Sequence, residues 1–125
     1  MENQTTQTEQ QVISPQERQE FDEFKRQKRV AEARLLIGKI ELSLTQASCE
    51  RAALRRALKD AEKLGIGGVC VLPYLVKPAH DYLGAASEVS VAALISPLGG
   101  TDTTDIKVRQ IKRALRDGAD VAEVT

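Results

Sequence analysis

Two stretches of the chain, AEKLGIGGVCV (61–71) and ALRDGADVAEV (114–124), decide its fold. They align without a gap, and each runs from the end of a helical pattern through a glycine stop and a short turn into a strand pattern. The alignment places Gly65 with Gly118 and Cys70 with Glu123. A repeated helix–turn–strand unit predicts parallel strands joined by right-handed helical crossovers.

The neighbouring sequence continues this alternation. EVSVAALISP (88–97) is the clearest strand pattern, and helices are predicted over about 49–64, 74–83 and 102–117. The short alternation IGKIELSLTQ (37–46) fits either an extended segment or a turn. The order after residue 46 is therefore α-β-α-β-α-β, with three parallel strands.

A different pattern precedes this α/β region. Residues 1–12 are rich in Gln and Thr and are predicted to be a disordered tail. Ser14, Pro15 and Glu17 form a capping-box signature that starts an amphipathic helix ending near Gly38. The predicted domains are thus a tail at 1–12, a helix at 13–38 and an α/β domain at 39–125.

The apolar stripe of this N-terminal helix is narrow, and Lys28 interrupts it. Its members are Phe21, Phe24, Ala31 and Leu35. Such a stripe fits a helix that packs on its own domain, and it also fits a helix that binds a partner or a second copy.

Composition excludes several functional classes. Formal charge is zero and aromatic residues make up 3% of the chain, which argues against a nucleic-acid surface. No apolar run approaches the roughly 20 residues of a membrane span, and Cys49 and Cys70 lack metal-ligand spacing. We therefore expect a soluble, cytoplasmic protein with free thiols and no metal ion, membrane or nucleic-acid partner.

Glu123 is the main candidate for chemistry. A carboxylate within an apolar parallel strand is costly to desolvate unless it is paired, protonated or placed at the carboxyl edge of the sheet. Three interpretations stay open: an acid/base or substrate-binding group, a buried structural pair, or simple exposure. Cys70, its counterpart in the repeat, is either a small buried hydrophobe or a nucleophile, and the repeat predicts that both side chains point to the same face.

Four blocks in the region from Ile40 to Val124 together resemble the 2-deoxyribose-5-phosphate aldolase family. The blocks are IELSLTQ (40–46), AEKLGIGGVCVLPYLV (61–76), VSVAALISPLGG (89–100) and IKVRQIKRALRDGADVAEV (106–124). The resemblance implies the first three strands and helices of a (β/α)8 barrel, that is, a partial TIM barrel. It also implies a class I aldolase that cleaves 2-deoxyribose 5-phosphate to acetaldehyde and glyceraldehyde 3-phosphate through a lysine Schiff base, without a cofactor.

The family's site residues carry over to four positions. The family's proton-relay aspartate falls on Glu123, its early aspartate on Glu41 and the following threonine on Ser43, while the family's strand cysteine is Cys70. The resemblance thus implies a catalytic Glu123, with Glu41, Ser43 and Cys70 in substrate binding.

Other positions depart from the family pattern. Leu42 replaces a histidine, Ser96 a phenylalanine and Val121 a glutamate, and no lysine falls at the end of a predicted strand. The family's Schiff-base lysine lies in later strands, so we expect this chain alone to be inactive and to need further sequence, an oligomer or a complementing chain. A (β/α)8 barrel requires roughly 200 residues or more, and this chain has 125.

Two other functions remain open. One is a non-enzymatic interaction or regulatory protein derived from an aldolase barrel, in which the charged helix covers the open sheet or recruits a partner. The other is a different α/β protein that binds a phosphorylated sugar or nucleotide through the glycine loop SPLGGTDT (96–103).

Overall fold

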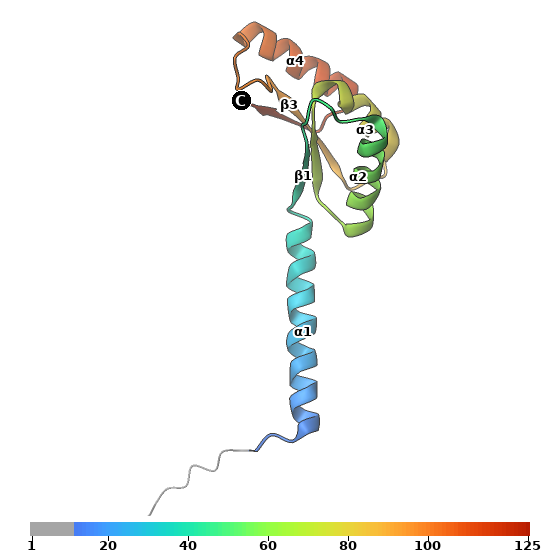
Figure 1. The fold of residues 1–125 in the computed structure, drawn as a ribbon, viewed down its shortest axis with the longest axis vertical. Coiled ribbons are helices and arrows are strands. Elements are labelled where there is room, and N and C mark those ends of the chain that lie inside the picture. Colours follow the sequence, from blue (N-terminus) through green and yellow to red (C-terminus); the bar gives the residue numbers. More distant parts are fainter. Residues whose placement is uncertain (1–11) are drawn as a thin grey trace, which may run out of the picture. The chain divides into compact units, whose positions relative to one another are not determined.

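The computed structural model describes residues 12–125, so residues 1–11 of the tail predicted at 1–12 lie outside the described residues. The chain divides into two units, up to Ala33 and from Arg34 onward. Figure 1 shows the helices and strands, coloured in sequence order from blue to red. They are α1 (Pro15–Ile37), β1 (Glu41–Leu44), α2 (Arg51–Leu64), β2 (Gly68–Val71), a 3-10 turn (Pro73–Leu75), α3 (Val76–Leu83), β3 (Ser90–Ile95), α4 (Thr104–Asp117) and β4 (Val121–Val124).

The predicted start and end of α1 are confirmed. The Glu17 backbone N–H donates to Ser14 Oγ at 3.2 Å, and the Ser14 N–H donates to a Glu17 carboxylate oxygen at 2.9 Å. This reciprocal pair is a capping box, which satisfies two of the free donors at a helix start. Helix α2 begins at Arg51, two residues later than the predicted start near residue 49, and no side chain caps its N-terminus.

The second unit is built on one parallel sheet with the strand order β1-β2-β3-β4. The predicted parallel α/β architecture is confirmed. Residues 37–46, predicted as either an extended segment or a turn, contribute the additional strand β1. The β1 register aligns Glu41 with Gly68 and Ser43 with Cys70. Each strand pairs with the next one in sequence, as in a barrel, whereas a doubly wound sheet reverses its order at a switch point.

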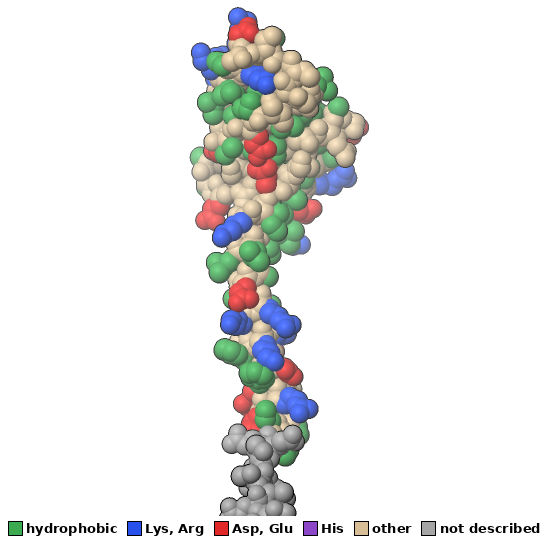
Figure 2. Space-filling model, turned by 90° about the vertical axis from the view of Figure 1, so that its left-hand side faces the viewer, with side chains coloured by type: hydrophobic (Ala, Val, Ile, Leu, Met, Phe, Trp, Pro, Cys, Tyr) green, Lys and Arg blue, Asp and Glu red, His purple; other side chains and the backbone are tan. Residues whose placement is uncertain are grey.

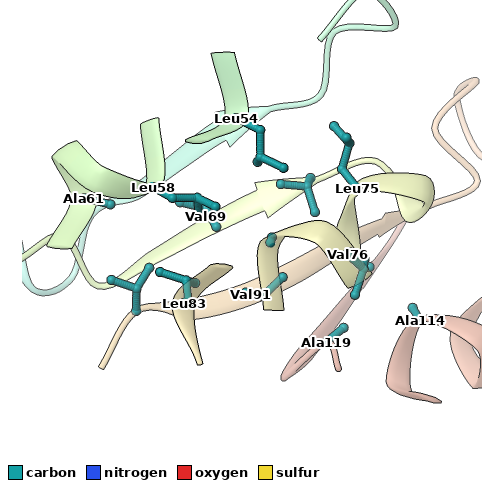
Figure 3. Packing of buried hydrophobic residues seen from close by; sticks show 14 of the residues in the cluster. Leu54, Leu58, Ala61, Val69, Leu75, Val76, Leu83, Val91, Ala114 and Ala119 are labelled. Carbon is teal, nitrogen blue, oxygen red and sulfur yellow. The ribbon is translucent and has the colours of Figure 1, made fainter. Parts of the chain in front are cut away.

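All the helix packing in this unit lies on one face of the sheet. Figure 3 shows Leu54, Leu58 and Ala61 of α2 above Val69 of β2, with Leu83 of α3 and Val91 of β3 beside them. Leu58, Val69 and Val76 are completely buried. Because alternate strand residues share a face, the residues between these core positions occupy the opposite face, against which α2, α3 and α4 do not pack.

The termini of α2 and α4 also follow the repeat. Gly65 and Gly118 end these helices in the left-handed conformation, with φ of 73° and 107°. Ile66 and Ala119 then donate to the carbonyls of Ala61 and Ala114, closing equivalent turns before β2 and β4. Among the described residues, no helix is apolar over enough length to cross a membrane.

Candidate active site

The face of the sheet opposite α2, α3 and α4 carries a cluster of three reactive side chains, Glu41, Cys70 and Glu123. Their Sγ and carboxylate oxygen atoms lie within 4.8 Å of one another. Glu41 begins β1, while Cys70 and Glu123 each occupy the third position of β2 and β4. In Figure 2 acidic side chains gather on one face of this unit, with hydrophobic side chains bordering them.

The cluster joins strands that are not neighbours in the sheet. Cys70 Sγ donates to Glu123 Oε2 at 3.4 Å, although β3 lies between β2 and β4. Ala92 pairs with Cys70 on one side and with Val121 on the other. A methyl side chain at position 92 leaves the space above β3 through which the longer Glu123 side chain reaches the thiol. The contact confirms that Cys70 and Glu123 point to the same face.

The electrostatics of the cluster are dominated by burial and by the two carboxylates. Cys70 is 3% exposed, and burial, reinforced by Glu123 and then Glu41, raises the pKa of its thiol to about 12. Partial burial, followed by the charge of Glu123, also raises the pKa of Glu41. This raised pKa disfavours the thiolate, which is the nucleophilic form of cysteine, and the protonated thiol donates to Glu123.

Ser43 lies beside this cluster without joining it. It shares the face of Glu41, two residues further along β1, and pairs in register with Cys70. Its hydroxyl lies 3.1 Å from that of Thr45. Of the four predicted site residues, the fold brings the reactive atoms of three within 4.8 Å of one another and places the fourth next to them.

The glycine loop after β3 is held by the protein itself. The backbone N–H of Ser96 donates to Gln110 Oε1 at 2.8 Å, and Gln110 Nε2 donates to Asp102 at 3.0 Å. Ser96 Oγ accepts the Asp102 N–H at 3.2 Å, and the Thr125 hydroxyl donates to the Ser96 carbonyl at 2.6 Å. Sequence reasoning missed Gln110, because a polar residue on a helix gives no signal of a contact fourteen positions earlier.

No lysine joins the cluster among residues 12–125, since none of the four strands contains one. Lys107 is fixed elsewhere, with its Nζ donating to the backbone carbonyl of Thr125 at 2.9 Å. The described residues thus supply two carboxylates and a thiol, while an amine that could form a Schiff base is absent from the cluster.

The chain is similar to proteins named deoxyribose-phosphate aldolase. It is 51% identical over 63 residues to that of Thermococcus kodakarensis, covering 49% of this chain and 28% of the relative. It is 34% identical over 90 residues to that of Aciduliprofundum boonei, covering 71% of this chain and 40% of the relative. No protein-family model matches the chain.

Solved structures agree with the sequence relatives. A Coccidioides immitis protein described as a deoxyribose-phosphate aldolase aligns with a TM-score of 0.63 and 30% identity, covering 66% of this chain and 32% of that one. The aldolase QR15 aligns with the same TM-score and identity, over 69% of this chain and 38% of its own. The chain spans well under half the length of these proteins. Both sequence and fold confirm that about residues 40–124 resemble the deoxyribose-phosphate aldolase family, over the part of those proteins that the chain spans.

Proposed function

We propose that residues 39–125 form part of the active site of a class I aldolase acting on 2-deoxyribose 5-phosphate. The observation that carries the proposal is the clustering of Glu41, Cys70 and Glu123, within 4.8 Å of one another, on the face of the parallel sheet opposite its packed helices. In a closed (β/α)8 barrel that face is the interior, and catalytic groups come from several different strands. Retro-aldol cleavage of this substrate would release acetaldehyde and glyceraldehyde 3-phosphate.

Glu123 would carry protons in this reaction. Cleavage of a carbon–carbon bond requires removal of a hydroxyl proton and later protonation of the enamine carbon, which is general acid–base work. The raised pKa of Glu41 favours one protonated and one ionised carboxyl in the pair. Cys70 would fix the orientation of Glu123 through its thiol, and Ser43 would offer a hydroxyl to the substrate.

The Schiff-base lysine would be supplied by residues outside this cluster, in further sequence or in a complementing chain. An amine with a lowered pKa is the nucleophile that this chemistry requires.

Trapping tests the proposal directly. Protein from its native source is incubated with deoxyribose 5-phosphate and borohydride, and the intact masses of the chain and of co-purifying polypeptides are measured. We expect a reduced adduct on a polypeptide that contributes the missing lysine. An adduct on the 125-residue chain itself would contradict the assignment of the nucleophile, and no adduct on any component would contradict aldolase activity.

Substitution of Glu123 tests its role in the completed enzyme. Glu123→Gln keeps the size of the side chain and removes its basicity, so turnover should fall by about 100-fold or more. The matched control is Glu88→Gln, since Glu88 is an exposed carboxylate outside the cluster. Near-normal turnover of Glu123→Gln in a steady-state cleavage assay would contradict the proton-transfer role.

One observation favours the second candidate, a non-enzymatic interaction protein. Helix α1 is 23 residues long, yet none of its residues is buried. If interaction is the function, a chain lacking residues 1–37 should lose its oligomeric state. Survival of the same assembly after that deletion would remove this candidate.

A further inference from the structure

Helix α1 has an apolar stripe that follows a heptad repeat. Phe21 and Phe24 occupy an a and a d position, and Ala31 occupies the next d position. Leu35 occupies the a position two heptads after Phe21, while Lys28 fills the a position between them. Phe21 is 54% exposed, Phe24 64% and Leu35 73%. In Figure 2 hydrophobic side chains lie between basic ones along this helix. Large aromatic side chains exposed to water on one stripe of a helix mark an interaction surface, so the stripe favours a partner helix.

We propose that α1 pairs with α1 of a second copy of the chain as an antiparallel two-stranded coiled coil. In this arrangement Phe21 faces Ala31 of the second copy, and Phe24 faces Lys28 of the second copy. Large side chains thereby meet small ones, and the rings of Phe24 receive the cation that interrupts the stripe. Because the pair is symmetric, each of these two contacts occurs twice.

The charges beside the stripe favour the antiparallel direction. Arg18 and Glu32 occupy e positions that meet across an antiparallel pair, and Glu20 and Arg34 occupy g positions that do the same. Symmetry doubles each pair, so four attractive contacts form. The single like-charge contact is Lys25 with its own copy, and Lys25 Nζ already lies 4.2 Å from the centroid of the Phe21 ring.

A parallel pair of α1 helices places the same residues in less favourable contacts. It places Lys28 against Lys28 in the middle of the apolar seam, where two cations must be desolvated together. Glu20 and Lys25 then form the only attractive charge pair between the helices, since Gln27 faces Glu32. The positions that Arg18 and Arg34 would face lie outside α1. The stripe and its flanking charges therefore select the antiparallel pair.

Charge exchange tests both the partner and its direction. The full chain is studied by sedimentation equilibrium, with far-UV circular dichroism as a check on folding. Arg18→Glu turns two attractive contacts into two repulsive ones and should weaken the dimer about tenfold. The double variant Arg18→Glu/Glu32→Arg restores both pairs and should return the dissociation constant to within about threefold of the original.

The matched control is Arg29→Glu, which makes the same charge change at a b position on the outer side of the helix. It should leave the dissociation constant nearly unchanged. Phe24→Asp should abolish the dimer and leave a folded monomer. The proposal is overturned if the chain stays monomeric at about 100 μM, or if the dimer survives Phe24→Asp. The antiparallel direction is overturned if the double variant does not restore the original dissociation constant. These measurements record association alone, so their outcome is independent of any aldolase activity.

Discussion

The Cys70 thiol is the most strongly perturbed acid of the cluster. Its pKa rises from an ordinary 9.0 to about 12 because burial and two nearby carboxylates all disfavour the thiolate. The neighbouring Ala92 is 1% exposed and has no bulk to separate the thiol from Glu123. One small residue on the central strand thus decides whether the carboxylate of β4 and the thiol of β2 can meet.

This perturbed thiol predicts a loss of stability at alkaline pH. Above pH 9 the unfolded chain releases the Cys70 proton while the folded chain retains it up to about pH 12, so the folded state binds more protons. The free energy of unfolding should therefore fall as pH rises through this window, by about 1.36 kcal/mol for each unit of pKa difference. Urea unfolding of Cys70→Ala should show a shallower fall.

Cys49→Ala provides the control for this experiment, because Cys49 is half-buried and lies outside the cluster. Its stability should follow the pH dependence of the unmodified chain. Equal slopes for the unmodified chain and Cys70→Ala would contradict the raised pKa.

Among the elements, α2 and α4 end in equivalent turns, but the glycines that end them differ in how well they tolerate an added side chain. Both glycines adopt positive φ, where a side chain is strained. A Cβ on Gly65 would meet nothing within 4 Å, whereas a Cβ on Gly118 would collide with the imidazole ring of His80. His80 is thus a packing neighbour of the turn before β4, and its place on α3 links that helix to the strand that carries Glu123.

The two glycine stops predict unequal costs for the same substitution. Gly65→Ala should lower the free energy of unfolding by about 1–2 kcal/mol, which is the cost of the left-handed conformation alone. Gly118→Ala adds the collision with His80 and should cost more. Urea denaturation of both variants measures the difference. The collision would be refuted by equal losses, and His80→Ala should relieve part of the loss in Gly118→Ala.

For the second unit as a whole, one face of the sheet holds the core and the other holds the candidate site. Helices α2, α3 and α4 pack on the face that contains Val69, Val71 and Val91. The opposite face carries carboxylates that a completed barrel would enclose. This division means that core substitutions should change stability without touching the cluster.

Substitutions at Leu58 and Leu64 test this division. Leu58 is 0% exposed in the core, so Leu58→Ala should cost about 2–5 kcal/mol of stability by leaving a cavity. Leu64 lies on the same helix and is 59% exposed, so Leu64→Ala should change stability by about 0.5 kcal/mol or less. Denaturant unfolding gives both values. A similar loss for both variants would contradict the one-sided core.

The sequence by itself determined the local structure of this protein. The capping box at Ser14, the glycine stops at Gly65 and Gly118 and the alternation of helix and strand patterns depend on neighbouring residues, so they can be read without coordinates. The repeat also predicted that Cys70 and Glu123 share a face, because strand alternation fixes side-chain direction.

Only the tertiary structure decided how these parts meet. The pairing of β1 with β2 made the ambiguous segment a strand and brought Glu41 to the cluster, since register between distant strands depends on contacts across the sheet. The contact of Cys70 with Glu123 across β3 likewise depends on the pairing of three strands and on the small side chain of Ala92 between them. The physical reason is that side-chain proximity between non-adjacent strands is a property of packing and not of local propensity.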